Sequence, residues 1–244
     1  MGEIRNDIYL GNYGPIDGTV EFYGRIQALV ERDSVVLNIG AGRGSWYYED
    51  YCVVRRELQN FKGAVAKYIC ADIDPIVLSN PTSDENILII NGLLDLPNES
   101  VDLVICDWVF EHVVDPVVFG TEIRRILKVG GIIAARTPHK YNYVSLMARL
   151  IPNKHHSKLL LRIQPRRKSV DVFPTIYRMN TKFDLKKSLG NFDDFTYLYR
   201  SEPTYNFGNM FAARIVERIE TIAPKFLVSQ LFVFKVKQPD KDLN

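Results

Sequence analysis

Hydrophobic and polar positions along the chain predict short buried strands separated by amphipathic helices. Apolar residues recur at helical spacing in Thr19–Glu31 and between about Pro116 and Lys128, and the Gly130–Gly131 pair is expected to end the second helix. Five short apolar runs predict strands at Val35–Ile39, Tyr68–Ala71, Ile87–Ile90, Val101–Cys106 and Gly131–Ala135. Because these strands alternate with helices, we expect βαβ units, a parallel sheet and helices on both of its faces.

The pattern changes after Pro138. Further helices are predicted at Tyr141–Leu150, Ser157–Ile163, Gly208–Ile222 and from an Asn180–Thr181 cap to about Leu189. Strands are predicted at Phe195–Tyr199 and Phe226–Val236. Residues 140–180 hold too few apolar residues for a core of their own, so we expect one domain over residues 1–244. Its parts are a leader with the first helix (1–32), a core (33–139), a basic insertion (140–180) that caps the substrate side, and C-terminal elements that complete the sheet (181–244).

The composition is typical of a globular protein. Of 244 residues, 46% are hydrophobic and 25% are charged, and no run approaches the roughly 18 apolar residues of a transmembrane helix. Residues 1–12 lack the apolar segment of a secretory signal. The three widely spaced cysteines, Cys52, Cys70 and Cys106, predict reduced thiols and a cytoplasmic protein rather than a disulfide framework.

Charge is unevenly distributed, although the net charge is only +2. Residues 1–139 carry 12 basic and 20 acidic side chains, whereas residues 140–168 carry 8 basic and no acidic ones. This basic block could receive an anionic substrate, lie on the surface of an anionic membrane, contact RNA, or form a solvated helical face. We expect no nucleic acid partner, because the pI of about 8.3 is modest and no RNA-binding module is visible.

A glycine-rich turn, Gly40-Ala41-Gly42-Arg43-Gly44, directly follows the first predicted strand. Glycines allow a ligand to approach the backbone, and such turns at the carboxyl ends of parallel strands bind ligands. Asp72 ends the second strand, where a carboxylate can accept both hydroxyls of a ribose. Adenine dinucleotide folds favour Gly-x-Gly-x-x-Gly, whereas the third glycine here comes one position early. The spacing therefore favours S-adenosylmethionine over a dinucleotide, with an ordinary glycine turn as the remaining alternative.

Five ordered motifs resemble those of the class I S-adenosylmethionine-dependent methyltransferases. They are Asn38–Gly44, Cys70–Pro75, Leu96–Val104, Phe110–Val113 and Leu127–Gly131, with Thr137-Pro138 following. The resemblance covers about residues 33–139 and is closest to small-molecule enzymes similar to quinone and surface-glycan methyltransferases. It implies an α/β, Rossmann-like, seven-stranded and mostly parallel sheet with helices on both faces and an antiparallel C-terminal hairpin.

The resemblance also implies site residues. Those that would bind S-adenosylmethionine are Asn38, Gly40, Ala41, Gly42, Gly44, Asp72, Ile73, Asn91, Gly92, Leu93, Cys106, Asp107 and Trp108. Within this set, Asp72 would hold the ribose and Ile73 would pack on adenine. The family's usual acid near Asn91 is missing, and Asn38 stands where the family often has an acid.

Methyl transfer from a sulfonium requires alignment above all, and an oxygen acceptor also benefits from a base. The candidate bases are His112, His139 and Asp107, with His155 as a further histidine. No metal site is expected, because no cysteine or acid lies near the His155–His156 pair. The stretch Phe173–Thr181 is similar to a segment of bacterial surface-glycan methyltransferases, which implies Tyr177 and Arg178 as acceptor contacts.

The leading hypothesis is methyl transfer to a small-molecule or lipid-linked acceptor, with O-methylation of a sugar or glycan intermediate foremost. The acceptor could be anionic, and residues 140–168 could touch an anionic membrane, which would make the protein cytoplasmic and peripheral to the membrane. A non-catalytic cofactor-binding or membrane-associated scaffold is the alternative from another class. A nicotinamide oxidoreductase is disfavoured, because no Tyr-x-x-x-Lys pair follows the fourth strand.

Overall fold

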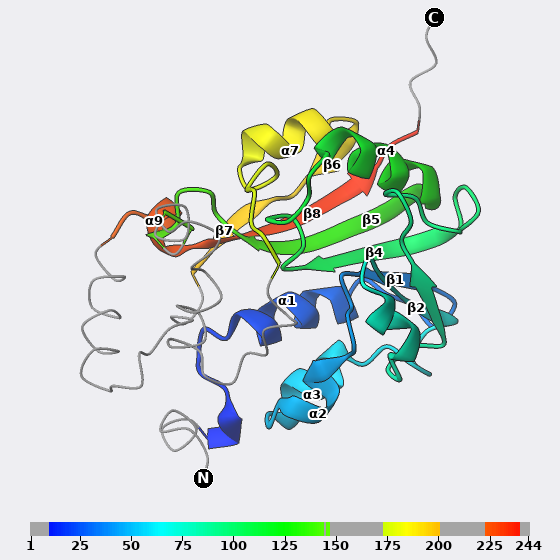
Figure 1. Ribbon diagram of the computed structural model, residues 1–244. Coiled ribbons are helices and arrows are strands. Elements are labelled where there is room, and N and C mark those ends of the chain that lie inside the picture. Colours follow the sequence, from blue (N-terminus) through cyan, green and yellow to red (C-terminus); the bar gives the residue numbers. More distant parts are fainter. Residues whose placement is uncertain (1–9, 144, 147–172, 201–222, 240–244) are drawn as a thin grey trace, which may run out of the picture.

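The predicted strands assemble into one mixed sheet (Figure 1), seen in a computed structural model that describes residues 10–143, 145–146, 173–200 and 223–239. The strands are β1 (Val35–Ile39), β2 (Lys67–Asp72), β3 (Glu85–Leu88), β4 (Val101–Asp107), β5 (Leu127–Pro138), β6 (Phe192–Asp194), β7 (Tyr197–Tyr199) and β8 (Gln230–Lys237). Their order is β3-β2-β1-β4-β5-β8-β6, and β7 also pairs with β8. Strands β1 to β5 are parallel, whereas β8 runs antiparallel to β5, β6 and β7.

The short strands β6 and β7 share one position in the sheet. Strand β6 pairs with Lys235–Lys237, and β7 pairs with Gln230–Phe232 of the same partner strand. Between them, the Phe195 N–H still donates to the Phe234 carbonyl at 2.9 Å, whereas the Thr196 N–H donates to Asp194 Oδ1 at 2.9 Å. The eight described strands thus fill seven positions, and the predicted mostly parallel sheet with antiparallel C-terminal strands is confirmed.

Three of the six described helices begin at a capping side chain. The six are α1 (Gly18–Gln27), α2 (Ser45–Glu49), α3 (Val53–Gln59), α4 (Pro116–Ile126), α7 (Lys182–Ser188) and α9 (Lys225–Val228), with 3-10 turns η1 (Leu10–Asn12) and η2 (Pro75–Ser79). The side chains of Asp17, Asp115 and Thr181 accept hydrogen bonds from backbone N–H groups in the first turns of α1, α4 and α7. The predicted cap at Thr181 is therefore confirmed.

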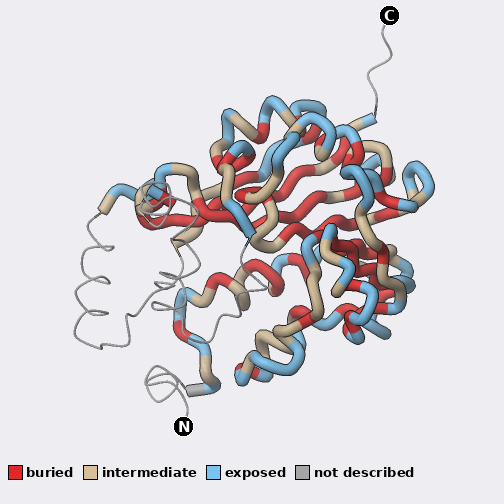
Figure 2. The backbone as a smooth tube through the Cα atoms, in the orientation of Figure 1, coloured by how far each residue is buried: buried red, intermediate tan, exposed pale blue. Residues whose placement is uncertain are grey.

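Two apolar layers enclose the sheet, whose strands are buried along most of their length (Figure 2). Helices α4 and α7 cover one face, where Ile123, Ile126, Leu185 and Leu189 belong to one core cluster. Helix α1 covers the other face, where Phe22, Tyr23 and Ile26 pack in a second cluster with Phe232 and Phe234. Burial on both faces explains why the strands read as continuous apolar runs.

The boundary between α4 and β5 differs from the prediction. The helix ends at Ile126, and β5 begins at Leu127 and runs through the glycine pair, so the expectation that Gly130–Gly131 stops the helix is wrong. The pairing of β4 with β5 shifts register between Val101 and Leu103. Gly130 has a φ of 81°, and a Cβ on Gly131 would lie 2.9 Å from the Lys128 carbonyl oxygen. These two glycines therefore allow an irregularity of the β-bulge type inside β5.

One further strand boundary differs from the prediction, and several predicted helices fall on residues that the structure does not describe. The last strand starts at Gln230 rather than Phe226, because α9 occupies Lys225–Val228. The helices predicted at Ser157–Ile163 and Gly208–Ile222 lie outside the described residues, as does half of Tyr141–Leu150. Among the helices that the structure describes, none is both long and apolar enough to cross a membrane.

The contact between α4 and α7 gives a test of this packing. A Cβ at Gly120 would lie 2.1 Å from the Ser188 carbonyl oxygen, so Gly120→Ala must push the two helices apart. We expect a loss of about 2–3 kcal/mol in the free energy of unfolding, measured by urea denaturation. Gly24→Ala in α1 is the matched control, because nothing lies within 4 Å of its Cβ position. This control should gain about 0.5–1 kcal/mol from helix propensity, and a similar gain for Gly120→Ala would contradict the packing.

Candidate functional site

The glycine turn after β1 is shaped by close contacts that exclude side chains. Gly40 and Gly44 have φ values of 75° and 67°. A Cβ on Gly40 would lie 2.5 Å from Val109 Cγ2, and one on Gly44 would lie 2.6 Å from Asn80 Oδ1. The backbone N–H groups of Gly40 and Ala41 donate to the Ala71 carbonyl at 2.8 and 3.3 Å. These contacts draw the turn toward the carboxyl end of β2.

Asp72 faces the glycine turn from the end of β2. Its Oδ2 accepts a hydrogen bond from the Gly42 N–H at 2.8 Å, and its Oδ1 accepts one from the Asp74 N–H at 3.0 Å. An ionised carboxylate offers about four acceptor positions, so two remain for a pair of hydroxyls. This donor and acceptor set fits a ribose held beside the glycine turn.

Exposed apolar side chains lie next to Asp72. Ile73, Ile90 and Leu93 are 65%, 62% and 58% exposed. The Ile89 N–H donates to the Asp72 carbonyl at 2.8 Å, which brings the segment after β3 beside this carboxylate. Asn91 and Gly92 turn the chain there with φ values of 53° and 78°. Exposed apolar groups beside a carboxylate fit the faces of a purine and the hydroxyls of its ribose, so the residues present suit S-adenosylmethionine.

Two polar residues that the sequence analysis missed hold these loops. Asn80 Nδ2 donates to the Gly42 carbonyl at 3.0 Å. Arg125 donates to the carbonyls of Leu94 and Leu96 and pairs with Glu122, whose pKa is lowered mainly by the hydrogen bond from Arg125. In the sequence, Glu122 and Arg125 have the spacing of an ordinary exposed pair on a helix, so no local signal identified them.

A buried ion pair closes the carboxyl ends of β4 and β5. Arg136 Nε and Nη2 each donate to one carboxylate oxygen of Asp107 at 2.7 Å. Tyr23 OH donates to Asp107 Oδ2 at 3.2 Å, and Arg136 Nη1 donates to Thr19 Oγ1 at 3.0 Å. Burial, followed by the nearby carboxylate of Asp107, raises the pKa of Tyr23, so this phenol stays a donor. Both oxygens of Asp107 are thus engaged, and the bonds of the pair to Tyr23 and Thr19 anchor α1 to the sheet. An arginine in an apolar strand was the signal that could have revealed the pair.

Trp108 follows Asp107 in a left-handed conformation with a φ of 59°. Its N–H donates to the Arg136 carbonyl at 2.8 Å, and the Arg136 guanidinium lies 5.5 Å from the centre of its ring. The next residue, Val109, packs against Gly40, and Trp108 itself is half-buried. The thiol of Cys106 is fully buried in the core, and Asn38 Nδ2 donates to the buried Tyr68 hydroxyl at 3.0 Å. Side chains of these two predicted cofactor contacts are therefore directed into the protein.

His112 lies one turn beyond Trp108 and is oriented by the segment after residue 172. Its Nδ1 lies 2.8 Å from the Pro174 carbonyl oxygen. Because a carbonyl only accepts, Nδ1 carries the hydrogen and the neutral ring keeps its lone pair on Nε2. The same segment is held by the Glu111 carbonyl, which accepts from the N–H groups of Ile176 and Tyr177 at 2.7 and 3.1 Å.

The other predicted catalytic and acceptor residues have different surroundings. Nδ1 of His139 accepts a hydrogen bond from the Tyr141 N–H at 3.3 Å, and burial lowers the pKa of this ring despite a bond to the Phe226 backbone. Tyr177 is only 4% exposed, whereas Arg178 is exposed and donates to the Val114 carbonyl at 2.6 Å. His155 and His156 lie outside the described residues.

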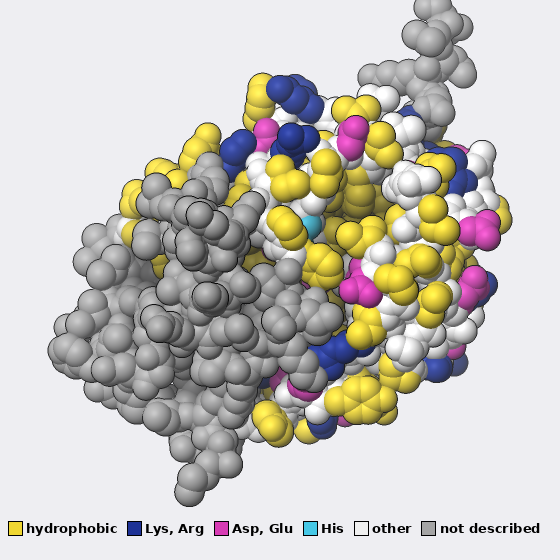
Figure 3. Space-filling model, in the orientation of Figure 1, with side chains coloured by type: hydrophobic (Ala, Val, Ile, Leu, Met, Phe, Trp, Pro, Cys, Tyr) yellow, Lys and Arg dark blue, Asp and Glu magenta, His cyan; other side chains and the backbone are white. Residues whose placement is uncertain are grey.

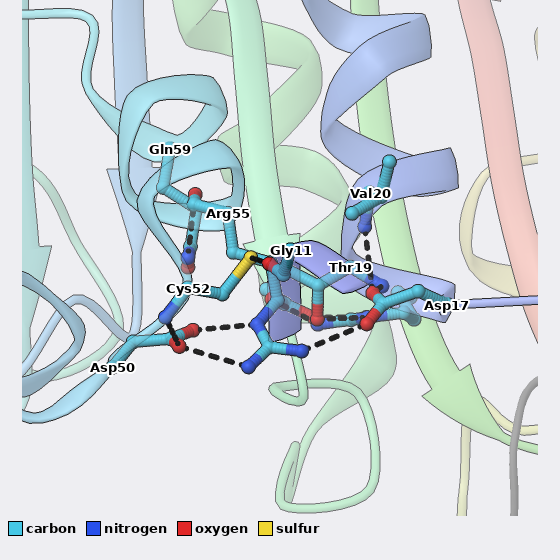
Figure 4. A network of polar contacts seen from close by, with 10 residues as sticks. Gly11, Asp17, Thr19, Val20, Asp50, Cys52, Arg55 and Gln59 are labelled. Carbon is cyan, nitrogen blue, oxygen red and sulfur yellow. Dashed lines mark hydrogen bonds and ion pairs between the residues drawn. The ribbon is translucent and has the colours of Figure 1, made fainter. Parts of the chain in front are cut away.

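A second network fixes the start of α1 against the helices that follow the glycine turn (Figure 4). Arg55 binds both carboxylate oxygens of Asp50 at 2.8 and 2.9 Å and donates to Asp17 Oδ2 at 2.8 Å. The hydrogen bonds to Asp50 are the main reason why the pKa of Arg55 is raised. The other oxygen of Asp17 caps α1. The helices that follow the glycine turn are therefore bound to the start of α1. Helix α1 in turn contacts the Asp107–Arg136 pair through Thr19 and Tyr23.

The Asp107–Arg136 pair can be tested through stability. In Asp107→Asn the Arg136 side chain, which is 7% exposed, loses its countercharge. We expect about 3–5 kcal/mol less free energy of unfolding in urea. Lys67→Met is the control, because it breaks an exposed pair with Glu85 and should cost under about 1 kcal/mol. Equal losses for the two variants would contradict the assignment of a buried anchor.

Known proteins share this architecture. Residues 37–135 match a family model described as a methyltransferase domain, and this range includes the glycine turn, Asp72 and Asp107. An S-adenosylmethionine-dependent methyltransferase from Archaeoglobus fulgidus superposes with a TM-score of 0.53 at 17% identity, over 89% of this chain and 92% of that one. A chain of the Haloferax volcanii complex that contains the Trm112 methyltransferase activator gives 0.55 at 16% identity, over 90% of each chain. No curated protein sequence matches the chain.

The similar solved structures show the fold. The family model indicates methyl transfer, with S-adenosylmethionine as the methyl donor. The matched residues include the glycine turn, Asp72 and the exposed apolar residues Ile73, Ile90 and Leu93. Residues 37–135 therefore match the methyltransferase domain family, and the fold is that of the class I S-adenosylmethionine-dependent methyltransferases.

Proposed function

We propose that this methyltransferase acts on a hydroxyl group of a small-molecule or lipid-linked acceptor, with a sugar or glycan intermediate foremost. The observation that carries the proposal is the orientation of His112, whose Nδ1 is bound to the Pro174 carbonyl. A hydroxyl must lose its proton as the oxygen attacks, and a neutral imidazole with its lone pair on Nε2 is suited to accept it. Among the other candidates, both oxygens of Asp107 accept from Arg136, and burial lowers the pKa of His139.

In the proposed reaction the bound cofactor supplies an activated methyl group on a sulfonium. The backbone of Gly40–Gly42 would line its methionine part, and Asp72 would accept the ribose hydroxyls. Ile73 would pack on the adenine, and Leu93 would lie at the adenine edge. The main contribution of these residues is alignment for an in-line displacement. As His112 becomes charged, the Pro174 carbonyl continues to accept its Nδ1–H and so stabilises the imidazolium.

The acceptor side is proposed to involve Tyr177 and Arg178. A guanidinium has five N–H donors, and one of those on Arg178 is bound to the Val114 carbonyl. The remaining donors suit a phosphate or carboxylate on the acceptor. The proposed membrane contact of residues 140–168 falls almost entirely outside the described residues, and with the cytoplasmic location it stays a proposal.

Cofactor binding is tested by titration calorimetry with S-adenosylhomocysteine, with NAD as the control ligand. We expect micromolar binding of the first and none of the second. Asp72→Ala should weaken binding by about 10- to 100-fold, because charged hydrogen bonds contribute about 1.5–3 kcal/mol each. Asp95→Ala is the matched control, since this exposed acid lies on the neighbouring loop. Unchanged affinity in Asp72→Ala would show that the ribose is held elsewhere.

The acceptor class is tested with nucleotide-linked and prenyl-phosphate-linked sugars, and methylated products are detected by mass spectrometry. With an accepted sugar, His112→Gln should lower kcat/KM by about 10²- to 10⁴-fold and abolish the decline of the parent's rate at low pH. Affinity for S-adenosylhomocysteine should persist. His139→Gln is the control and should stay within a few fold of the parent. Methylation of amines but of no sugar would reject the proposed acceptor, and an unchanged pH profile in His112→Gln would reject the base.

A further inference from the structure

The outer face of α7 combines lysines with an exposed aromatic ring. The helix buries Leu185 and Leu189 toward α4 and the sheet, which turns Lys182, Phe183, Lys186 and Lys187 outward. Phe183 is 68% exposed, and Lys187 Nζ lies 4.5 Å from the centre of its ring. Figure 3 shows Lys and Arg side chains gathered with hydrophobic ones at the upper edge of the molecule, where Figure 1 places α7.

The positive charge of this face is only partly balanced. Asp184, the one acid of the helix, is turned back to the Thr181 hydroxyl at 2.7 Å and lies 3.8 Å from Lys140. Asp194 is the ion-pair partner of the buried Lys235 at 3.3 Å. No acidic side chain among the described residues forms an ion pair with Lys182 or Lys186.

These lysines border an open groove. Lys182, Phe183 and Lys186 line it on the helix side, and Gly190, Phe192, Asp194 and Lys235 line the other side. The groove has a volume of about 420 Å³. It therefore offers room for a small anionic group, and its lining has three lysines, Lys182, Lys186 and Lys235, against one acid, Asp194.

We propose that this surface, which we name the α7 face, docks the protein onto membranes through the phosphodiester headgroups of anionic lipids. Charge complementarity is the first reason, because each lysine near an anionic bilayer contributes attraction. The exposed ring of Phe183 is the second, since an aromatic side chain flanked by lysines is suited to the boundary between headgroups and acyl chains. A small soluble anion would bind the lysines but would leave the Phe183 ring exposed to water.

The α7 face is joined rigidly to the methyltransferase site. Asn180, two residues before α7 begins, donates from Nδ2 to Thr137 Oγ1 at 2.7 Å and to the Pro138 carbonyl at 3.0 Å. These acceptors lie at the carboxyl end of β5, the edge at which the cofactor site is built. Docking through α7 therefore keeps that edge close to the bilayer. The inference goes beyond the proposed acceptor and holds whichever hydroxyl is methylated.

Vesicle flotation of the full chain tests the proposal. The probes are vesicles of phosphatidylcholine alone and vesicles in which about one third is phosphatidylglycerol. We expect retention on the anionic vesicles only, weakening as salt is raised. Lys182→Gln combined with Lys186→Gln should weaken binding about 30-fold, since about 1 kcal/mol per lysine corresponds to about fivefold. Phe183→Ala should weaken it about tenfold.

The matched control is Arg32→Gln combined with Lys62→Gln, which removes the same charge from exposed positions before β1 and after α3. This control should bind vesicles within about twofold of the parent. Unchanged affinity of every variant for S-adenosylhomocysteine verifies that the fold is retained. The proposal is overturned if the parent does not bind anionic vesicles, or if the two double variants lose binding equally. Lysine-dependent binding to single-stranded RNA without binding to vesicles would also overturn it.

Discussion

The buried ion pair between Asp107 and Arg136 is the interaction on which the rest of the site depends. It joins the carboxyl ends of two neighbouring parallel strands and recruits Tyr23 and Thr19 from α1. Two charges in such a place are tolerated only when the hydrogen bonds around them are nearly complete, and here each carboxylate oxygen has an arginine donor. The pair also positions Trp108, because the same arginine supplies its carbonyl to the backbone and its guanidinium to the indole.

The predicted cofactor site depends on close approach of a ligand to the backbone of the glycine turn more than on charged side chains. Glycine is required where Val109 and Asn80 press on the turn, and this same absence of side chains lets a ligand reach the backbone. Asp72 closes the turn through the Gly42 N–H and retains acceptor positions for a ribose. The Arg55 network then ties the helices after the turn to the cap of α1, so the turn and the ion pair belong to one framework.

The segment that begins at residue 173, which carries the proposed acceptor contacts, is attached to this framework. Pro174 orients His112, the Glu111 carbonyl holds the next backbone groups, and Asn180 fixes the start of α7 to the end of β5. One continuous stretch therefore links the proposed base with the lysine-rich α7 face. An enzyme that presents its acceptor edge and a cationic aromatic surface together is suited to substrates held at an anionic membrane.

The sequence by itself determined the features that depend on neighbours along the chain. The runs of β1, β2 and β4, the glycine turn and the position of Asp72 follow from apolar periodicity and from the backbone freedom of glycine. Tertiary structure alone decided the pairing of Asp107 with Arg136, 29 positions away, and the supporting roles of Asn80 and Arg125. It also placed Gly130 and Gly131 inside a strand, because pairing with β4 outweighed their local tendency to end a helix. Contacts between distant segments have no local signature, so only the packed sheet could reveal them.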